Sequence, residues 1–161
     1  MIKNYIEYLK NVFVASTANR FDYSIKKQKV SSSKFYVLDN SFLKTIAFNF
    51  SENAGKRLEN LVFIELLRRG FDIYYFANKN ECDFVIKEGL KITKAIQVCL
   101  VLDNPVTKKR EVEGLVEALK EYNLKEGLIL TLDKEEEITY GDKKIIVKPV
   151  WKWLLEKRLT K

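Results

Sequence analysis

Two acidic side chains stand in apolar surroundings, and a polar pair follows them on a later segment. Glu59 lies in a helical stretch whose third, fourth and seventh following residues are Val, Phe and Leu, so its carboxylate should face a sheet. Asp83 lies inside the apolar run CDFVI. Gln97 and Cys99 are two residues apart in a strand-like segment, so their side chains share one face. Because a buried carboxylate is costly unless it is paired, these four residues are the first candidates for a site.

The lack of histidine narrows the chemistry that such a site could perform. The chain has no histidine, which excludes Ser-His-Asp and Cys-His triads and HExxH metalloproteases. Its two cysteines, Cys82 and Cys99, form no CxxC pair, which excludes a zinc ribbon and argues against a disulfide framework. Any hydrolysis would therefore depend on carboxylates, lysines and a hard cation such as Mg²⁺ or Mn²⁺.

The four candidates resemble the site of the PD-(D/E)XK nuclease superfamily, particularly its Holliday-junction-resolvase-like branch. The resemblance is carried by Glu59 in its helix, by ECDFVI (residues 81–86) and by AIQVC (residues 95–99). It implies that Glu59, Asp83 and Gln97 would hold one or two divalent metal ions, which activate water for attack on a phosphodiester. Gln97 stands where the second strand acid belongs, and Cys99 stands where the family lysine belongs.

These two departures predict weak catalysis. Gln97 offers a metal a neutral carbonyl in place of a charge, and Cys99 cannot replace an ammonium. The loss of both groups should cost several kcal/mol of transition-state stabilisation, on the order of a thousand-fold or more in rate. A lysine from elsewhere could substitute, and Lys94 is the nearest on the strand, with Lys108 and Lys109 on the following helix as further candidates.

A longer resemblance covers most of the chain. It looks like the nuclease-like C-terminal region of archaeal AAA+-type ATPases, through the following segments: YVLDNSFL (36–43), RLENLVFIELLRRG (57–70), ECDFVI, residues 109–133 and VKPVWKWLLE (147–156). The chain has no GxxxxGK[ST] motif, so no ATPase activity is expected. The resemblance implies a related ATPase as a possible partner.

Basic residues concentrate near the N-terminus. The net charge is +7, and residues 1–50 hold eight Lys and Arg against three Asp and Glu. Aromatic residues are interleaved with the basic ones, and this pattern suits a nucleic acid. The predicted nucleic-acid-binding residues are Arg20, Lys26, Lys27, Lys29 and Lys34. The alternative is a solvated edge hairpin protected by its lysines.

The hydrophobic patterns predict an α/β fold with a mixed central sheet and helices on both faces, as in a restriction-endonuclease-like core. From residue 51 the predicted order is helix, three strands, helix, three strands, helix. Before it, a helix over residues 2–13, strands at 21–27 and 34–39, and a short helix over 39–48 are expected. Residues 1–50 would form a small N-terminal helix and hairpin extension, and residues 51–161 the nuclease-like domain.

Three hypotheses about function follow from these patterns. The first is a degenerate nuclease-fold module that binds DNA or a protein partner with little or no cleavage. The second is a divalent-metal-dependent endonuclease with a displaced lysine, and the third is a stand-alone fragment that associates with a related ATPase. No apolar run approaches the roughly 18–20 residues of a membrane span, and no signal peptide is recognisable, so a soluble cytoplasmic protein is expected.

Overall fold

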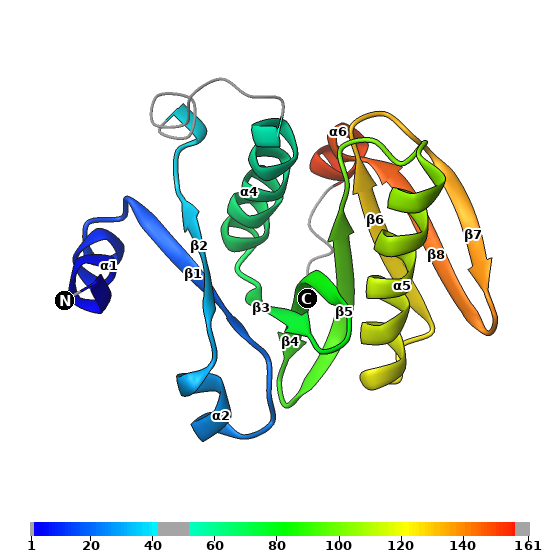
Figure 1. The fold of residues 1–161 in the computed structure, drawn as a ribbon. Coiled ribbons are helices and arrows are strands. Elements are labelled where there is room, and N and C mark those ends of the chain that lie inside the picture. The colour runs from blue at the N-terminus through cyan, green and yellow to red at the C-terminus, as the bar shows by residue number, and fades with distance from the viewer. Residues whose placement is uncertain (1, 42–51, 157–161) are drawn as a thin grey trace.

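The computed structural model describes residues 2–41 and 52–156, which form one eight-stranded mixed sheet with helices on both faces (Figure 1). The elements in chain order are α1 Ile2–Asn11, β1 Ala15–Arg20, α2 Ile25–Val30, β2 Ser33–Val37, α4 Glu52–Arg68, β3 Asp72–Ala77, β4 Glu81–Glu88, β5 Lys91–Val98, α5 Pro105–Glu121, β6 Glu126–Thr131, β7 Glu136–Tyr140, β8 Lys143–Pro149 and α6 Val150–Leu155. From α4 onward this is the order that the sequence predicts.

The sheet has the strand order β2-β1-β3-β4-β5-β6-β8-β7. Strands β1 and β3, β5 and β6, and β6 and β8 pair in parallel, and the remaining neighbours pair antiparallel. The expected α/β class with a mixed sheet is therefore confirmed. Among the helices described, none is both long and apolar enough to cross a bilayer.

Two hydrophobic cores lie on opposite faces of the sheet. One is built around α5 and includes Val112, Leu115 and Leu119. The other is built around α4 and α6 and includes Phe63 and Trp153. Alternate residues of each strand supply the two cores, because successive side chains of a strand point to opposite faces.

Capping residues mark the start of α5 and the end of α4, the two helices that position the site. The Asn104 side chain accepts hydrogen bonds from the amides of Val106 and Thr107, and Pro105 occupies the first turn of α5. Gly70 has φ +76° just after α4, the left-handed conformation that ends many helices. These signals explain why α4 and α5 agree closely with the helices that the sequence predicts over residues 51–70 and 104–123.

The N-terminal segment differs from the prediction. The strand expected at residues 21–27 is wrong, because Ser24 begins helix α2 there and the strand lies earlier, at β1. The sequence ASTANR of β1 is polar and small, and its pairing with β2 and β3 outweighs its weak strand propensity. Because β1 joins β3, the sheet continues across the boundary predicted at residue 50. The helix expected over 39–48 falls mostly outside the described residues.

Candidate functional site

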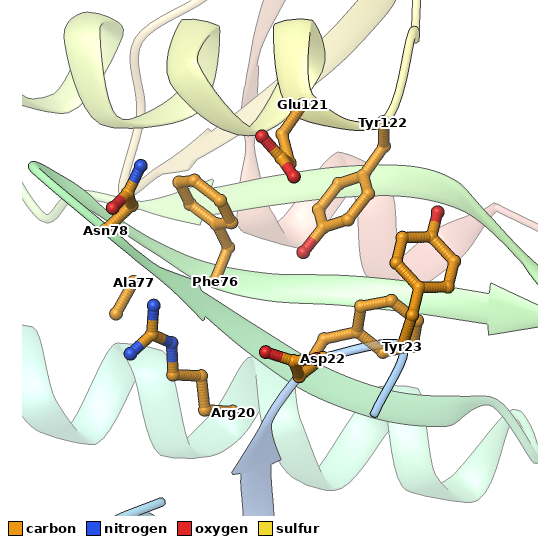
Figure 2. Close-up of a pocket in the computed structure, with 9 residues that line it drawn as sticks. Arg20, Asp22, Tyr23, Phe76, Ala77, Asn78, Glu121 and Tyr122 are labelled. Atoms are coloured by element: carbon orange, nitrogen blue, oxygen red, sulfur yellow. The ribbon is translucent and has the colours of Figure 1, made fainter. Parts of the chain in front are cut away.

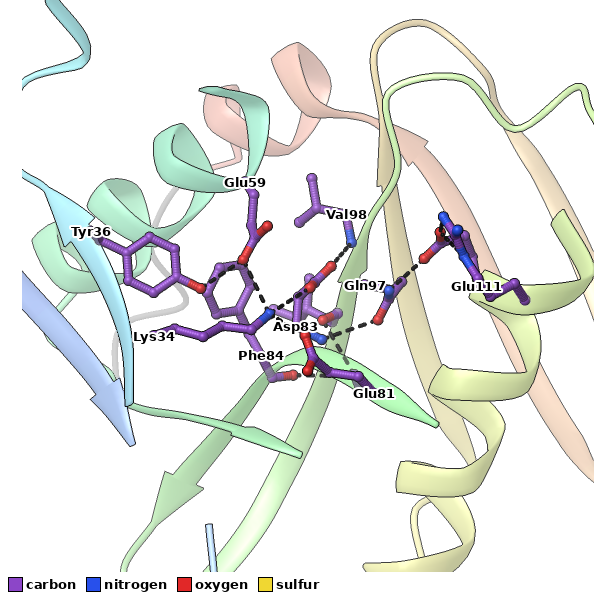
Figure 3. A network of polar contacts seen from close by, with 12 residues as sticks. Lys34, Tyr36, Glu59, Glu81, Asp83, Phe84, Gln97, Val98 and Glu111 are labelled. Carbon is purple, nitrogen blue, oxygen red and sulfur yellow. Dashed lines mark hydrogen bonds and ion pairs between the residues drawn. The ribbon is translucent and has the colours of Figure 1, made fainter. Parts of the chain in front are cut away.

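A lysine ammonium lies at the centre of the candidate site (Figure 3). The Nζ of Lys34, on β2, is 3.2 Å from Glu59 Oε1, 2.9 Å from Asp83 Oδ1 and 2.7 Å from Glu81 Oε1. We call these four residues the Lys34 cluster. The predicted convergence of Glu59 and Asp83 is therefore present, with a cation from the N-terminal segment between them.

Glu59 is directed to the sheet by the apolar face of α4, as predicted. Val62, Phe63 and Leu66, which follow Glu59 on the same side of the helix, are at most 1% exposed. The Tyr36 hydroxyl donates a hydrogen bond of 2.7 Å to Glu59 Oε1, and its ring stacks on Phe63 at 4.0 Å. Lys34 and Tyr36 are two residues apart on β2, so both side chains reach the same face of the sheet.

Asp83 reaches the α4 face because β4 is irregular at this point. The pairing with β3 shifts by one residue between Tyr74 and Phe76, where β4 contributes an extra residue. Phe84 belongs to the core beside α4, and Asp83 forms an ion pair with Lys34 of the same region, so two consecutive residues serve one face. Such bulges redirect side chains near functional sites. The amide of Val98 donates to Asp83 Oδ2 at 3.0 Å.

Gln97 connects the Lys34 cluster to helix α5. Its Oε1 accepts a hydrogen bond of 3.1 Å from the Asp83 amide, and its Nε2 donates to Glu111 Oε2 at 2.5 Å. Glu111 is 7% exposed and also pairs with Arg110. Gln97 and Asp83 are thus neighbours, but the Gln97 oxygen is directed at a backbone amide.

Cys99 lies on the α5 side of the sheet, in the core there. Its Sγ contacts the carbonyl oxygen of Val101 at 3.2 Å. Burial raises the pKa of the Cys99 thiol to about 11, so the thiolate that a nucleophile needs is scarce at neutral pH. The expected convergence is therefore present for Glu59 and Asp83, Gln97 reaches the Asp83 amide, and Cys99 lies with the core beside α5.

Close packing of α5 on β4 holds Glu111 of α5 near the Lys34 cluster. A Cβ added at Gly114 would lie 2.3 Å from the carbonyl oxygen of Glu81, so only glycine allows this approach. The same approach brings Glu111, one turn earlier in α5, to Gln97.

Acidic groups outnumber cations in the Lys34 cluster. Three carboxylates surround one ammonium, a formal balance of −2. Burial opposes the charged form of Lys34, but the charges of Asp83 and Glu59 outweigh it and hold the pKa of Lys34 above its usual range. Burial raises the pKa of Asp83 to about 6, because burial together with the Glu59 charge exceeds the opposing effect of Lys34. The cluster is therefore short of positive charge.

The lysines proposed as substitutes for the family lysine lie elsewhere. Lys94 pairs with Glu88, Lys108 pairs with Glu136, and Lys109 lies 3.9 Å from Glu113. The lysine that contacts the site is Lys34, which the sequence assigned to a nucleic-acid-binding surface. The other members of that predicted surface, Arg20, Lys26, Lys27 and Lys29, lie at the end of β1 and on α2, outside the Lys34 cluster.

Sequence reasoning missed four members of the network: Lys34 in this role, Tyr36, Glu81 and Glu111. Glu81 could have been found, because it precedes Asp83 by two residues on the same strand. Glu111 also gives a signal, since it shares the apolar side of its helix with Leu115 and Ala118, which are fully buried. Lys34 and Tyr36 give none, because their partners lie 25 to 49 and 23 residues away in the chain.

The groups in the cluster that suit a hard cation are the carboxylate oxygens of Glu59, Glu81 and Asp83. Within residues 2–41 and 52–156, no three His, Cys, Asp or Glu side chains are arranged to hold a metal ion. In this arrangement the three carboxylates bind the Lys34 ammonium and accept hydrogen bonds.

Two longer proteins are similar in sequence to this chain. Uncharacterized protein MJ1544 of Methanocaldococcus jannaschii is 39% identical over 168 residues, which cover 96% of this chain and 36% of that protein. An uncharacterised protein of Haemophilus influenzae is 32% identical over 92 residues, which cover 56% of this chain and 23% of that protein. The chain thus spans about a third or less of these relatives. No family model and no solved structure matches it.

Proposed function

We propose that this chain is a nuclease-like module that binds nucleic acid without cutting it, because Lys34 takes the place of a divalent cation. The observation that supports this most is the Lys34 ammonium between the carboxylates of Glu59 and Asp83, at 3.2 Å and 2.9 Å. An internal cation at this place occupies the position between the acids that a Mg²⁺ or Mn²⁺ ion would need, and it offsets one of their negative charges.

The neighbouring groups favour the same proposal. A catalytic metal also needs a further strand ligand, but the Gln97 oxygen accepts a hydrogen bond from the Asp83 amide. The Cys99 thiol is buried on the other face and cannot bind a phosphate as a lysine would. Loss of both groups removes the transition-state stabilisation that phosphodiester cleavage requires.

Charge supports the nucleic-acid-binding part of the proposal. The chain carries a net charge of +7, and five of these charges arise from residues 1–50. Positive surfaces of this kind bind phosphate backbones with an affinity that falls as salt rises. Because the similar proteins are much longer, the module would act within or beside a larger polypeptide, for which a related ATPase is the candidate.

One experiment tests both parts of the proposal. Supercoiled plasmid is incubated with the protein and Mg²⁺ or Mn²⁺, and binding to labelled single-stranded, duplex and junction DNA is measured across salt concentrations. We expect no more nicking by the wild type than by Asp83→Asn, together with salt-dependent binding. Nicking that disappears in Asp83→Asn would contradict the first part. No binding to any DNA would contradict the second and leave a protein partner.

A second candidate function is an endonuclease that uses Lys34 as its displaced lysine. The favouring observation is that Lys34 contacts both carboxylates that match the family metal ligands. This candidate predicts metal-dependent nicking that both Asp83→Asn and Lys34→Met abolish while Lys125→Met, a change at an exposed lysine just before β6, leaves it intact. Our first proposal predicts no metal-dependent nicking in any of these proteins.

A further inference from the structure

A pocket with aromatic walls lies on the face of the sheet opposite the Lys34 cluster (Figure 2). Its walls include Phe21 and Phe76, which belong to the core beside α5. Phe76 pairs with Cys82, the residue before Asp83, so the pocket and the cluster lie back to back at the same end of β3 and β4. The pocket is therefore a separate place from the predicted catalytic residues.

The aromatic side chains hold one another at right angles. Phe21 contacts Tyr23 at 5.1 Å and Tyr122 at 5.6 Å between ring centroids, and Phe76 contacts Tyr122 at 5.8 Å, all with interplanar angles near 80°. Tyr23 nevertheless remains 69% exposed. A ring that is positioned by its neighbours but exposed to solvent offers a ready stacking surface.

The volume of the pocket limits what can enter. It encloses about 240 Å³, which is less than the roughly 300–1,000 Å³ of sites that bind drug-sized ligands. One planar ring system fits this space better than a whole nucleotide or a folded peptide. A second hollow of about 590 Å³ continues beyond Tyr23 and Tyr122, so a chain attached to the ring could leave the pocket there.

Polar groups surround the opening and suit the edge of a heteroaromatic ring. Figure 2 shows Arg20, Asp22 and Glu121 around it. In the described parts of the chain, no hydrogen bond or ion pair engages the Arg20 guanidinium or the Glu121 carboxylate. Asp22 Oδ1 accepts a hydrogen bond of 2.8 Å from the Ser24 amide, which fixes that carboxylate at the rim. Donors and acceptors are thus available together, as recognition of a base edge requires.

Helix α2, directly after Tyr23 and Ser24, supplies positive charge beside the pocket. Lys26, Lys27 and Lys29 are exposed, and none forms an ion pair with another described residue. Residues 20–30 include four basic side chains and one acidic side chain, Asp22, so this segment has a net charge of +3. A surface of uncompensated lysines favours a polyanion such as a phosphate backbone.

We propose that this pocket binds one unpaired base of a single-stranded nucleic acid, with the base stacked against Tyr23 and the adjacent phosphates on the lysines of α2. Aromatic stacking next to a basic groove is the usual way in which single strands are bound without strong sequence preference. This inference rests on the nucleic-acid-binding part of the proposed function, and it adds the type of strand and the place of contact.

The test compares oligonucleotides and variants by fluorescence anisotropy. The probes are a labelled single strand, the fully paired duplex of the same sequence, and that duplex with one unpaired adenine, each prepared as DNA and as RNA. We expect tighter binding of the single strand and of the unpaired base than of the perfect duplex. Tyr23→Ala should weaken single-strand binding about 5- to 100-fold, and Tyr23→Phe should change it less than about 3-fold.

The basic helix is tested separately by the triple change of Lys26, Lys27 and Lys29 to Gln. This variant should bind all probes more weakly and show a shallower dependence on salt. The base-binding role of the pocket would be refuted if Tyr23→Ala bound the single strand as tightly as the wild type does. It would also be refuted if the wild type bound paired and unpaired probes equally well. Either result would leave the proposed function standing. Failure of every probe to bind would overturn both.

Discussion

Helix α4 carries two acidic residues in partly buried ionic clusters, and the two clusters have opposite charge balances. Glu59 belongs to the Lys34 cluster, where three carboxylates share one ammonium. Glu65, less than two turns later, is a single carboxylate shared by two guanidinium groups, with 2.7 Å to Arg68 and 2.6 Å to Arg69. We call Glu65, Arg68 and Arg69 the Glu65 cluster.

The charge balance separates a structural cluster from a candidate functional one. Hydrogen bonding from Arg68 lowers the pKa of Glu65 to about 2, whereas burial raises the pKa of Asp83 to about 6. Arg69 also stacks on Trp153 at 4.3 Å and donates to its carbonyl oxygen at 2.8 Å, which fixes α6 to α4. In the Glu65 cluster the single acid is fully paired and holds helices together, while the Lys34 cluster retains excess acid, a property common at functional sites.

The largest effect is expected from Lys34→Met, which removes the one cation of the Lys34 cluster. The uncompensated carboxylates should lower the free energy of unfolding at pH 7 by about 3–5 kcal/mol. Urea denaturation measures this loss. Lys26→Met, on exposed α2, is the matched control and should change stability by less than about 0.5 kcal/mol. Equal stability of the two variants would show that Lys34 is not the counter-ion of the cluster.

Glu65→Gln should have the next largest effect. It leaves Arg69, whose side chain is 9% exposed, without its acid, and we expect a loss of about 2–4 kcal/mol. The control is Glu113→Gln, because Glu113 lies 3.9 Å from exposed Lys109, and such surface pairs contribute about 0–1 kcal/mol. A loss for Glu65→Gln no greater than for the control would remove the proposed structural role.

The two clusters should respond to pH in opposite directions. The raised pKa of Asp83 contributes stability that is complete below pH 3.8 and is lost as the pH rises through about 6. The lowered pKa of Glu65 contributes stability that is complete above pH 4.5 and is lost as the pH falls towards 2.

This difference is measured by urea denaturation of the wild type, Asp83→Asn and Glu65→Gln over the acidic range. The stability advantage of the wild type over Asp83→Asn should shrink as the pH rises, and its advantage over Glu65→Gln should shrink as the pH falls. The same direction of change for both variants would contradict the assigned charge balances.

Tyr36→Phe should have the smallest effect. It removes the 2.7 Å hydrogen bond to Glu59 but retains the ring that stacks on Phe63. A hydrogen bond to a charged group contributes about 1.5–3 kcal/mol, and the half-buried Glu59 places this case near the lower limit. Tyr23→Phe, in which the ring is mostly exposed, is the control. No difference between the two variants in thermal unfolding would argue against the contact.

The sequence predicted those parts of the site that depend on local pattern. Glu59 and Asp83 were recognisable because each carboxylate interrupts an apolar run, and the helices and strands after residue 51 follow from periodicity and capping residues. Lys34 was not recognisable, since its contact with Asp83 spans 49 residues and forms only when β2 joins the sheet. The strand β1 was missed because long-range pairing outweighs the propensity of its polar residues.

The side of the sheet that Asp83 occupies was also beyond reach of the sequence. The bulge in β4 turns Asp83 to the α4 face, while Cys99 remains on the α5 face. A strict alternation of side chains along each strand does not reveal such an irregularity.

Carbon-13 NMR titration of the Asp83 carboxyl group tests the central claim most directly, because it reports the environment of the acid itself. We predict that the wild-type group titrates near pH 6 and that Lys34→Met raises its pKa further, since the lysine opposes the effects of burial and of Glu59. A wild-type titration near the ordinary value of 3.8, unchanged by Lys34→Met, would contradict a cluster in which one lysine is shared by three acids and Asp83 is buried.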